Sequence, residues 1–375
     1  MNLSKKNFRV LQRELCFILL FFSIAVHAAA TPSLEDSIPI LPRKKNVGEI
    51  LMNWVDIFNR CDTVYIRPHR YNYALLTTYS THLEQYGLYS EENSKQTLVL
   101  SPAPQRKIGL YFGWKFLFLG WSVDVDKLGF SGKRRNRGTT IDLSFYSSRI
   151  GLDLLYHRTS NTYRIHRITG FSPSTSSASL PLFDGLDTDI RGFYLYYIFN
   201  SQRFSYPAAY SQTTNQRRSA GSWMMGVAHS SHRLFFDENR FPESIQQEMS
   251  PSMRVTKVAY ATTSLYVGYG YNWVVGQNLL VNLTLNPAIA YKRSSADAES
   301  SLGTPTTRKQ HQWGVDFLGR AGLVYNNGRY FIGSSFVAKV FNYRRNSFFL
   351  SNSLGTLQVY AGFNFDLKKE YRKHP

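Results

Sequence analysis

The stretch LLVNLTLNPAIAY, residues 279–291, decides the fold. From position 281 onward, large apolar side chains occupy odd positions except 287, whereas Asn, Thr, Asn, Ala and Ala occupy the even ones. A period of two places the two sets on opposite faces of an extended strand. The run is also longer than a usual soluble strand and suffices for a tilted strand to cross a bilayer. It therefore indicates a strand with lipid on one face and a polar interior on the other.

The same alternation recurs along the chain, at 141–145, 265–273 and 357–367. The apolar segment 108–125 changes phase near Lys115, so we interpret it as a hairpin rather than a membrane helix. Short turns with glycine at 276–278 and 327–328 alternate with long polar segments at 231–253 and 294–309, as in outer-membrane barrels. Segment 203–220 is long where a short turn is expected, so it either folds into the lumen or hides a further strand.

These patterns predict an all-β fold, an antiparallel up-and-down transmembrane β-barrel of about 12 strands (10–14), over residues 62–367. We expect a signal peptide at 1–30, because four basic residues precede a short apolar run (16–26) and three alanines end at Ala30. Residues 31–61 are predicted to be a periplasmic leader with a short amphipathic helix, and 368–375 a basic tail. A soluble periplasmic β-sandwich is the alternative architecture.

The chain is strongly basic, with a formal net charge of +19. Removing the predicted signal, with four basic residues and one acidic residue, leaves +16. An exported chain meets lipid and lipopolysaccharide phosphates rather than nucleic acid. The clusters at 133–137, 217–218, 308–309 and 344–345 are therefore interpreted as loops beside anionic head groups. We expect the cell outer membrane as the location, its lipids and the barrel-assembly machinery as partners, and no nucleic acid. The oligomeric state is left open.

Cysteine usage excludes several classes of site. Cys61 is the only cysteine left after signal cleavage, so the mature chain holds no internal disulfide or multi-cysteine metal site. No glycine-rich phosphate loop or zinc-protease helix is present, and no cofactor is expected.

Polar residues on the inward stripe are the candidates for a ligand or solute path. They either line a pore or pair with one another to fill the lumen. The set comprises Asp142, Asp153, His157, Asn282, Asn286, Asp316, Arg320, Asn364 and Asp366.

Two further segments carry chemistry in principle. His229 and Ser231 suggest a barrel-embedded lipid hydrolase or acyltransferase, with His229 as base and Ser231 as nucleophile. Asp184, Asp187 and Asp189 could hold a hard cation such as calcium, although they lack EF-hand spacing and equally fit an acidic turn.

Several motifs resemble one known family. The segments 62–72, 109–114, 145–153, 204–212 and 218–222 together resemble an uncharacterised family of exported Bacteroidetes proteins, a domain of unknown function of the DUF4421 type. The resemblance runs from about Asp62 to Leu367. It implies an outer-membrane β-barrel and brings no catalytic residues.

The sequence thus favours a non-enzymatic outer-membrane barrel that binds or passes an anionic or amphiphilic ligand. The hydrolase with Ser231 and His229, and the soluble sandwich, remain the alternatives.

Overall fold

The computed structural model divides into two units, residues 1–51 and 52–375. It describes residues 61–90, 95–114, 117–125, 137–160, 163–172, 182–254, 256–294, 310–345 and 348–372, all in the second unit. The predicted signal peptide, the leader up to residue 60, its amphipathic helix and the basic clusters at 133–136 and 308–309 lie outside these residues. The tail prediction falls on the short helix α7 (Lys369–Arg372) and on residues beyond it.

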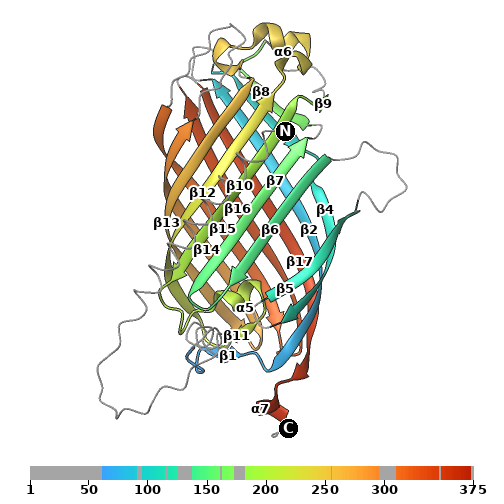
Figure 1. Ribbon diagram of the computed structural model, residues 1–375, viewed down its shortest axis with the longest axis vertical. Coiled ribbons are helices and arrows are strands. Elements are labelled where there is room, and N and C mark those ends of the chain that lie inside the picture. Colours follow the sequence, from blue (N-terminus) through green and yellow to red (C-terminus); the bar gives the residue numbers. More distant parts are fainter. Residues whose placement is uncertain are drawn as a thin grey trace, which may run out of the picture. The chain divides into compact units, whose positions relative to one another are not determined.

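Twelve strands of eight residues or more form one antiparallel sheet (Figure 1). In chain order they are β2 (Tyr71–Ser90), β4 (Gln105–Trp114), β5 (Leu117–Asp124), β6 (Arg137–Tyr146), β7 (Ile150–Ser160), β10 (Leu186–Ile198), β12 (Ala220–Phe236), β13 (Lys257–Gly276), β14 (Leu279–Ser294), β15 (Gln310–Asn326), β16 (Tyr330–Arg345) and β17 (Phe348–Leu367). Around the wall they run β5-β4-β2-β17-β16-β15-β14-β13-β12-β10-β7-β6. The prediction of an up-and-down β-barrel of about twelve strands is confirmed.

The ends of this order, β5 and β6, are not joined by a strand ladder within the described residues. We call the junction between them the seam. Every other neighbouring pair of the twelve strands is hydrogen-bonded. The longest ladder joins the first long strand to the last, from Phe348–Ser90 to Leu367–Tyr71.

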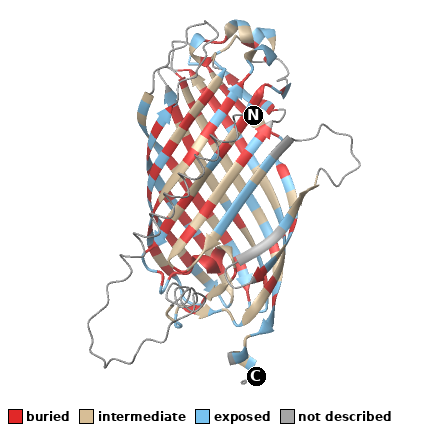
Figure 2. Ribbon diagram, viewed as in Figure 1, coloured by how far each residue is buried: buried red, intermediate tan, exposed pale blue. Residues whose placement is uncertain are grey.

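The wall exposes apolar side chains on its outer face and buries polar ones on its inner face, the reverse of a soluble sheet protein. Figure 2 shows buried and exposed residues alternating along the strands. In β14 every second residue from Leu280 to Ser294 is buried. The outward partners include Leu283 and Ile289, and Ile289 remains 62% exposed. Such a continuous exposed apolar surface is rare in soluble proteins and is the expected lipid face of a membrane barrel. The fold is therefore not a β-sandwich of two sheets around an apolar core.

The turns follow the sequence signals. β13 and β14 are joined through Asn278, whose φ is +73°, and β15 and β16 through Gly328, whose φ is +98°. β4 and β5 form the predicted hairpin, from Lys107–Asp124 to Trp114–Leu117. No helix in the described part of the chain has the length and apolarity that a membrane crossing requires.

Two sets of short elements cover the ends of the barrel (Figure 1). We call residues 199–219 the plug; it contains α5 (Tyr206–Tyr210) and β11 (Thr214–Gln216), which pairs with β1 (Ile66–Pro68). At the opposite end lie β3 (Thr97–Pro102), β8 (Tyr163–Thr169), β9 (Leu182–Phe183), η1 (Glu238–Arg240), α6 (Glu243–Glu248) and η2 (Pro251–Met253), which we call the cap. The short turns between the twelve strands in the described residues lie at the plug end, as they do at the periplasmic end of other outer-membrane barrels.

Candidate functional site in the lumen

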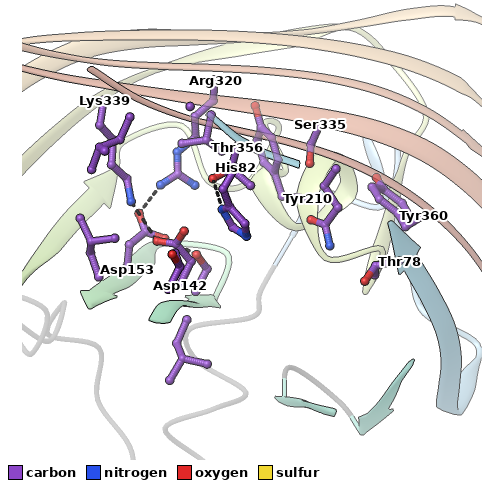
Figure 3. A pocket seen from close by; sticks show the side chains of 18 of the residues that line it. Thr78, His82, Asp142, Asp153, Tyr210, Arg320, Ser335, Lys339, Thr356 and Tyr360 are labelled. Atoms are coloured by element: carbon purple, nitrogen blue, oxygen red, sulfur yellow. Dashed lines mark hydrogen bonds and ion pairs between the residues drawn. The ribbon is translucent and has the colours of Figure 1, made fainter. Parts of the chain in front are cut away.

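A cavity of about 350 Å³ lies in the lumen beside the seam (Figure 3). Strands β2, β4, β6, β7, β15, β16 and β17 and the plug contribute to its wall. One part of the lining is polar, with His82, Asp142 and Lys339, and another part is aromatic or aliphatic, with Tyr210, Val337 and Leu354. The volume falls within the range of small-molecule sites.

An ion pair inside a tyrosine cluster forms the side of the cavity next to the plug. The guanidinium of Arg320 contacts the carboxylate of Asp153, and its Nη1 donates to the Tyr146 hydroxyl at 2.8 Å. Ser144 Oγ donates to the other oxygen of Asp153 at 2.6 Å. The guanidinium also lies within 6 Å of four tyrosine rings, those of Tyr146, Tyr196, Tyr206 and Tyr210. Such cation–π contacts and the buried carboxylate hold the charge in place, since a desolvated guanidinium needs both.

A second ion pair, formed by Lys339 and Asp142, is more exposed than the Arg320–Asp153 pair. Lys339 Nζ lies 3.2 Å from Asp142 Oδ1, and the side chains are 18% and 31% exposed. Beside it, His82 Nδ1 is 3.1 Å from the Thr356 hydroxyl. Figure 3 shows these groups facing the same space as Arg320 and Asp153. The cavity therefore offers charged groups that are already compensated by a partner.

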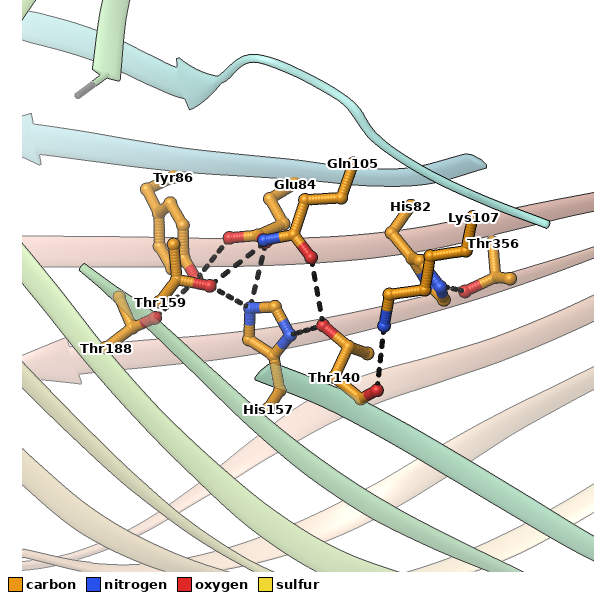
Figure 4. A network of polar contacts seen from close by, with 10 residues as sticks. All are labelled: His82, Glu84, Tyr86, Gln105, Lys107, Thr140, His157, Thr159, Thr188 and Thr356. Atoms are coloured by element: carbon orange, nitrogen blue, oxygen red, sulfur yellow. Dashed lines mark hydrogen bonds and ion pairs between the residues drawn. The ribbon is translucent and has the colours of Figure 1, made fainter. Parts of the chain in front are cut away.

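A hydrogen-bonded network lies toward the cap, centred on Glu84 and His157 (Figure 4). Glu84 Oε1 is 3.0 Å from His157 Nε2, and His157 Nδ1 is 2.9 Å from the Thr140 hydroxyl. Thr159 and Tyr86 donate to the Glu84 carboxylate at 3.2 and 3.3 Å. Glu84 and His157 are buried, so these bonds replace the water that each group loses.

The plug fills one end of the lumen. Tyr210 donates to Asn282 at 2.5 Å, and Gln212 Nε2 donates to the Tyr360 hydroxyl at 2.9 Å. The amide of Asn272 donates to the Ser205 carbonyl at 2.8 Å. Segment 203–220 therefore folds into the lumen, one of its two predicted outcomes.

The cap closes the opposite end with an apolar cluster. Tyr86, Tyr163, Phe183, Phe241 and Ile245 are among its buried members. Phe183 and Phe241 stack with ring centroids 3.9 Å apart. The cavity thus lies between two packed ends.

The predicted lumen residues divide by position. Asp142, Asp153, His157 and Arg320 line the cavity. Three others are buried on the inward face of β14 and β15, away from the cavity lining: Asn282, Asn286 and Asp316. Asp316 pairs with buried Lys292 at 2.5 Å and accepts from Ser264 at 3.2 Å.

The last two predicted lumen residues lie at the rim of the barrel on the plug side. Asn364 is buried and donates to the Gly328 carbonyl at 2.9 Å. Asp366 is exposed, and Asn72 and Arg372 contact its carboxylate. Its φ of +60° breaks the alternation, so assigning Asp366 to the lumen is wrong.

The predicted hydrolase pair does not face the cavity. His229 and Ser231 lie on the outer face of β12, where His229 Nδ1 is 3.0 Å from the Thr263 hydroxyl of β13. The inward neighbours Ser230 and His232 contact each other instead, at 2.8 Å, and both are buried. The serine and histidine of the prediction are thus separated from the cavity by the wall.

The acidic segment does not converge on one point. Asp184 and Asp189 pair with different arginines, Arg240 at 3.4 Å and Arg191 at 2.7 Å. Asp187 lies on the exposed side of β10. Within the described ranges, no group of three or more His, Cys, Asp or Glu side chains could hold a metal ion.

The sequence reasoning missed several residues of the site, above all His82, Glu84 and Lys339. Their positions carry a signal, because His82 and Glu84 share the parity of buried Thr78 and Tyr86 on β2, and Lys339 that of buried Ser335 on β16. Residues of the same parity on one strand share a face.

Several solved structures are similar to this chain, all at low identity. The outer membrane protease OmpT of Escherichia coli is 8% identical with a TM-score of 0.36, and the match covers 78% of this chain and 97% of that one. OprG of Pseudomonas aeruginosa is 8% identical with a TM-score of 0.23, covering 80% and 98%. Ail of Yersinia pestis, solved with a heparin analogue, is 8% identical with a TM-score of 0.23, covering 78% and 99%. These similarities carry no argument about what this chain binds.

No curated protein sequence matches the chain. One family pattern does, over residues 60–365, and its description is a domain of unknown function. This match covers most of the chain and agrees with the extent of the barrel. The chain therefore belongs to the DUF4421 family.

Proposed function

We propose that this protein resides in the outer membrane and binds an amphiphilic ligand in its lumen cavity, without catalysing a reaction. The observation that carries this proposal is the cavity itself, closed between plug and cap and lined by polar groups on one part and apolar groups on another.

The closed ends favour binding over free passage. Tyr206, Ala208 and Ala209 of the plug are at most 3% exposed. A conducting pore needs a continuous aqueous path, whereas these residues pack against the wall. Steady conductance through the barrel is therefore not expected.

The paired charges favour an amphiphilic ligand over a strongly anionic one. Arg320 is matched by Asp153, Lys339 by Asp142, and Glu84 by His157. A phosphate or sulfate would have to displace a carboxylate from its cation, which costs more than binding to an uncompensated cluster. A head group with hydroxyls or amides can bond to these pairs without separating them.

Binding can be measured with a fluorescent probe, dansyl-undecanoic acid, added to the full chain in lipid nanodiscs. Its methyl ester serves as the neutral counterpart. We expect saturable fluorescence above that of empty nanodiscs for both probes. Planar bilayers containing the protein should show no steady conductance.

A matched pair of variants tests whether the cavity is the site. Ser335 lies on the cavity wall, whereas Ser334 is its outward neighbour on β16. Ser335→Trp should weaken probe binding about tenfold or more by filling the cavity, and Ser334→Trp should leave it unchanged. Equal effects of the two variants, or silent bilayers together with no probe binding, would contradict the proposal.

A further inference from the structure

The edge of β6 at the seam lacks the burial alternation that β14 keeps to its end. Residues Ile141, Asp142, Leu143 and Ser144 are all exposed, although consecutive strand residues point to opposite faces. In β14, by contrast, buried and non-buried residues alternate to the end of the strand. Asp142 and Ser144 are exposed toward the cavity, and Ile141 and Leu143 are exposed on the opposite face, next to the edge that has no neighbouring strand among the described residues.

A side chain forms a hydrogen bond at the β6 edge, where a neighbouring strand would otherwise form one. Lys107 of β4 donates from Nζ to the backbone carbonyl of Thr140 at 2.9 Å. In a closed wall, the adjoining strand supplies this donor from its backbone. A lysine side chain of β4 thus contacts the β6 edge near its cap end.

The cavity reaches this edge. Its lining includes five consecutive residues of β6, from Asp142 to Tyr146. Inward side chains alone would contribute only every second residue, so the edge of the strand itself borders the cavity. Cavity and seam are therefore contiguous.

Lipid contact at such an edge is costly. Each backbone group left without a partner in the hydrocarbon costs several kcal/mol, and irregular backbone at membrane depth is tolerated where it lines a cavity. Plug and cap fill the two ends of the lumen, and the seam is the side of the cavity where two neighbouring strands share no ladder in the described part of the chain.

We propose that the seam is a lateral passage through which a single-chain amphiphile moves between the lipid phase and the cavity. This inference rests on the proposed function, since it names the route and the class of ligand. The apolar chain of the ligand would lie between the outward side chains at the seam, among them Trp121 and Leu143, which are 80% and 48% exposed. Its head group would reach His82 and the Asp142–Lys339 pair.

Thiol labelling from two phases tests the passage. In full-length protein with Cys16→Ser and Cys61→Ser, single cysteines are introduced by Ser144→Cys at the seam, Thr284→Cys on the inward face of β14, and Val315→Cys on the outer face. Thr284 is fully buried and Val315 is 62% exposed. Proteoliposomes are treated with pyrene maleimide dissolved in the lipid, or with a charged sulfonate maleimide in water. Heat-modifiable gel mobility verifies that each variant is folded.

Pyrene maleimide should label the Ser144→Cys variant about tenfold or more faster than the Thr284→Cys variant, and at a rate comparable to the Val315→Cys variant. The charged reagent should label the Ser144→Cys variant about tenfold more slowly than the lipid-dissolved reagent. Equal labelling of the seam and β14 cysteines from lipid would overturn the passage, as would labelling of the seam cysteine from water alone.

Probe binding separates this inference from the proposed function. If dansyl-undecanoic acid binds but the seam cysteine resists the lipid-dissolved reagent, the cavity is a site and the route is wrong. If the seam cysteine reacts from lipid but no probe binds in any variant, the opening exists and the proposed function fails. Pyrene attached at residue 144 should also reduce probe binding about tenfold, because it occupies the passage.

Discussion

Strands β12 to β15, which we call the β12–β15 wall, and the strands at the seam share the same alternating pattern of side chains. They differ in whether each strand has a neighbour on both sides. In the wall, each strand has a neighbour on both sides, and inward polar groups such as Lys292 and Asp316 are almost fully buried. At the seam, β6 has a neighbour on one side within the described residues, and the Asp142–Lys339 pair beside it stays partly exposed. The difference teaches that the alternating sequence determines which side chains of a strand point inward. The neighbouring strands determine whether those side chains are buried from water.

The largest effect is expected from the buried ion pair of the wall. Asp316→Asn leaves the Lys292 ammonium buried beside a neutral amide, which should lower the free energy of unfolding by about 3–5 kcal/mol. Urea unfolding in liposomes, followed by heat-modifiable gel mobility, measures the loss. The double variant Lys292→Met with Asp316→Leu is the control and should recover most of the stability, because no charge remains uncompensated. If Asp316→Asn unfolds at the same urea concentration as the wild type, Lys292 must reach water in this wall.

The next largest difference is expected in hydrogen exchange, which should be faster at the seam than in the β12–β15 wall. Amides of β6 that point to the seam lack a strand partner, so peptides covering 141–145 should exchange about 100-fold faster than peptides covering 280–290 of β14. Mass spectrometry of the protein in nanodiscs gives both rates in one sample. Equal protection would show that β5 and β6 pair in the bilayer.

Substituting glycines by alanine is expected to have a smaller effect on the free energy of unfolding. A Cβ at Gly268 in the wall would lie 2.2 Å from the Leu285 carbonyl oxygen, whereas the nearest atom to a Cβ at Gly355 of β17 is 3.5 Å away. Gly268→Ala should therefore destabilise by about 1–3 kcal/mol through overpacking, and Gly355→Ala by less. The same unfolding assay compares the two. Similar midpoints would indicate that the backbone of β13 and β14 moves apart easily.

The smallest effect concerns the ion pair beside the seam. Because Asp142 and Lys339 are partly exposed, Asp142→Asn should change the free energy of unfolding by no more than about 1 kcal/mol. Unfolding in low and high salt checks this, since a screened pair loses its small contribution in salt. A cost near that of Asp316→Asn would erase the distinction between seam and wall.

The sequence predicted the strands of the wall well, because period two is a local property. It placed Asp153, Asn282 and Arg320 on the inward face, and it identified the 108–125 hairpin. It could not supply the partners, since Lys339 and Asp142 are 197 residues apart and register between distant strands leaves no local pattern.

The errors have local causes. Residue type alone favours His229 and Ser231 as a catalytic pair, whereas the parity of buried Met224 and Gly226 on β12 places 230 and 232 inward. Extending the alternation to Asp366 ignores the left-handed backbone of this residue, which ends the pattern. Both cases show that parity must be followed residue by residue to the end of the strand.

The β17–β2 ladder has a consequence for how the barrel is assembled. It pairs Tyr71 with Leu367, and beside it the side chains of Asn72 and Asp366 bond across 294 positions of the chain. Pairing of such remote segments is entropically slow and requires the final strand to have been synthesised and delivered. A chain truncated before residue 348 would thus be expected to stall as an incomplete sheet, with β2 and β16 exposing the edges that β17 normally bridges.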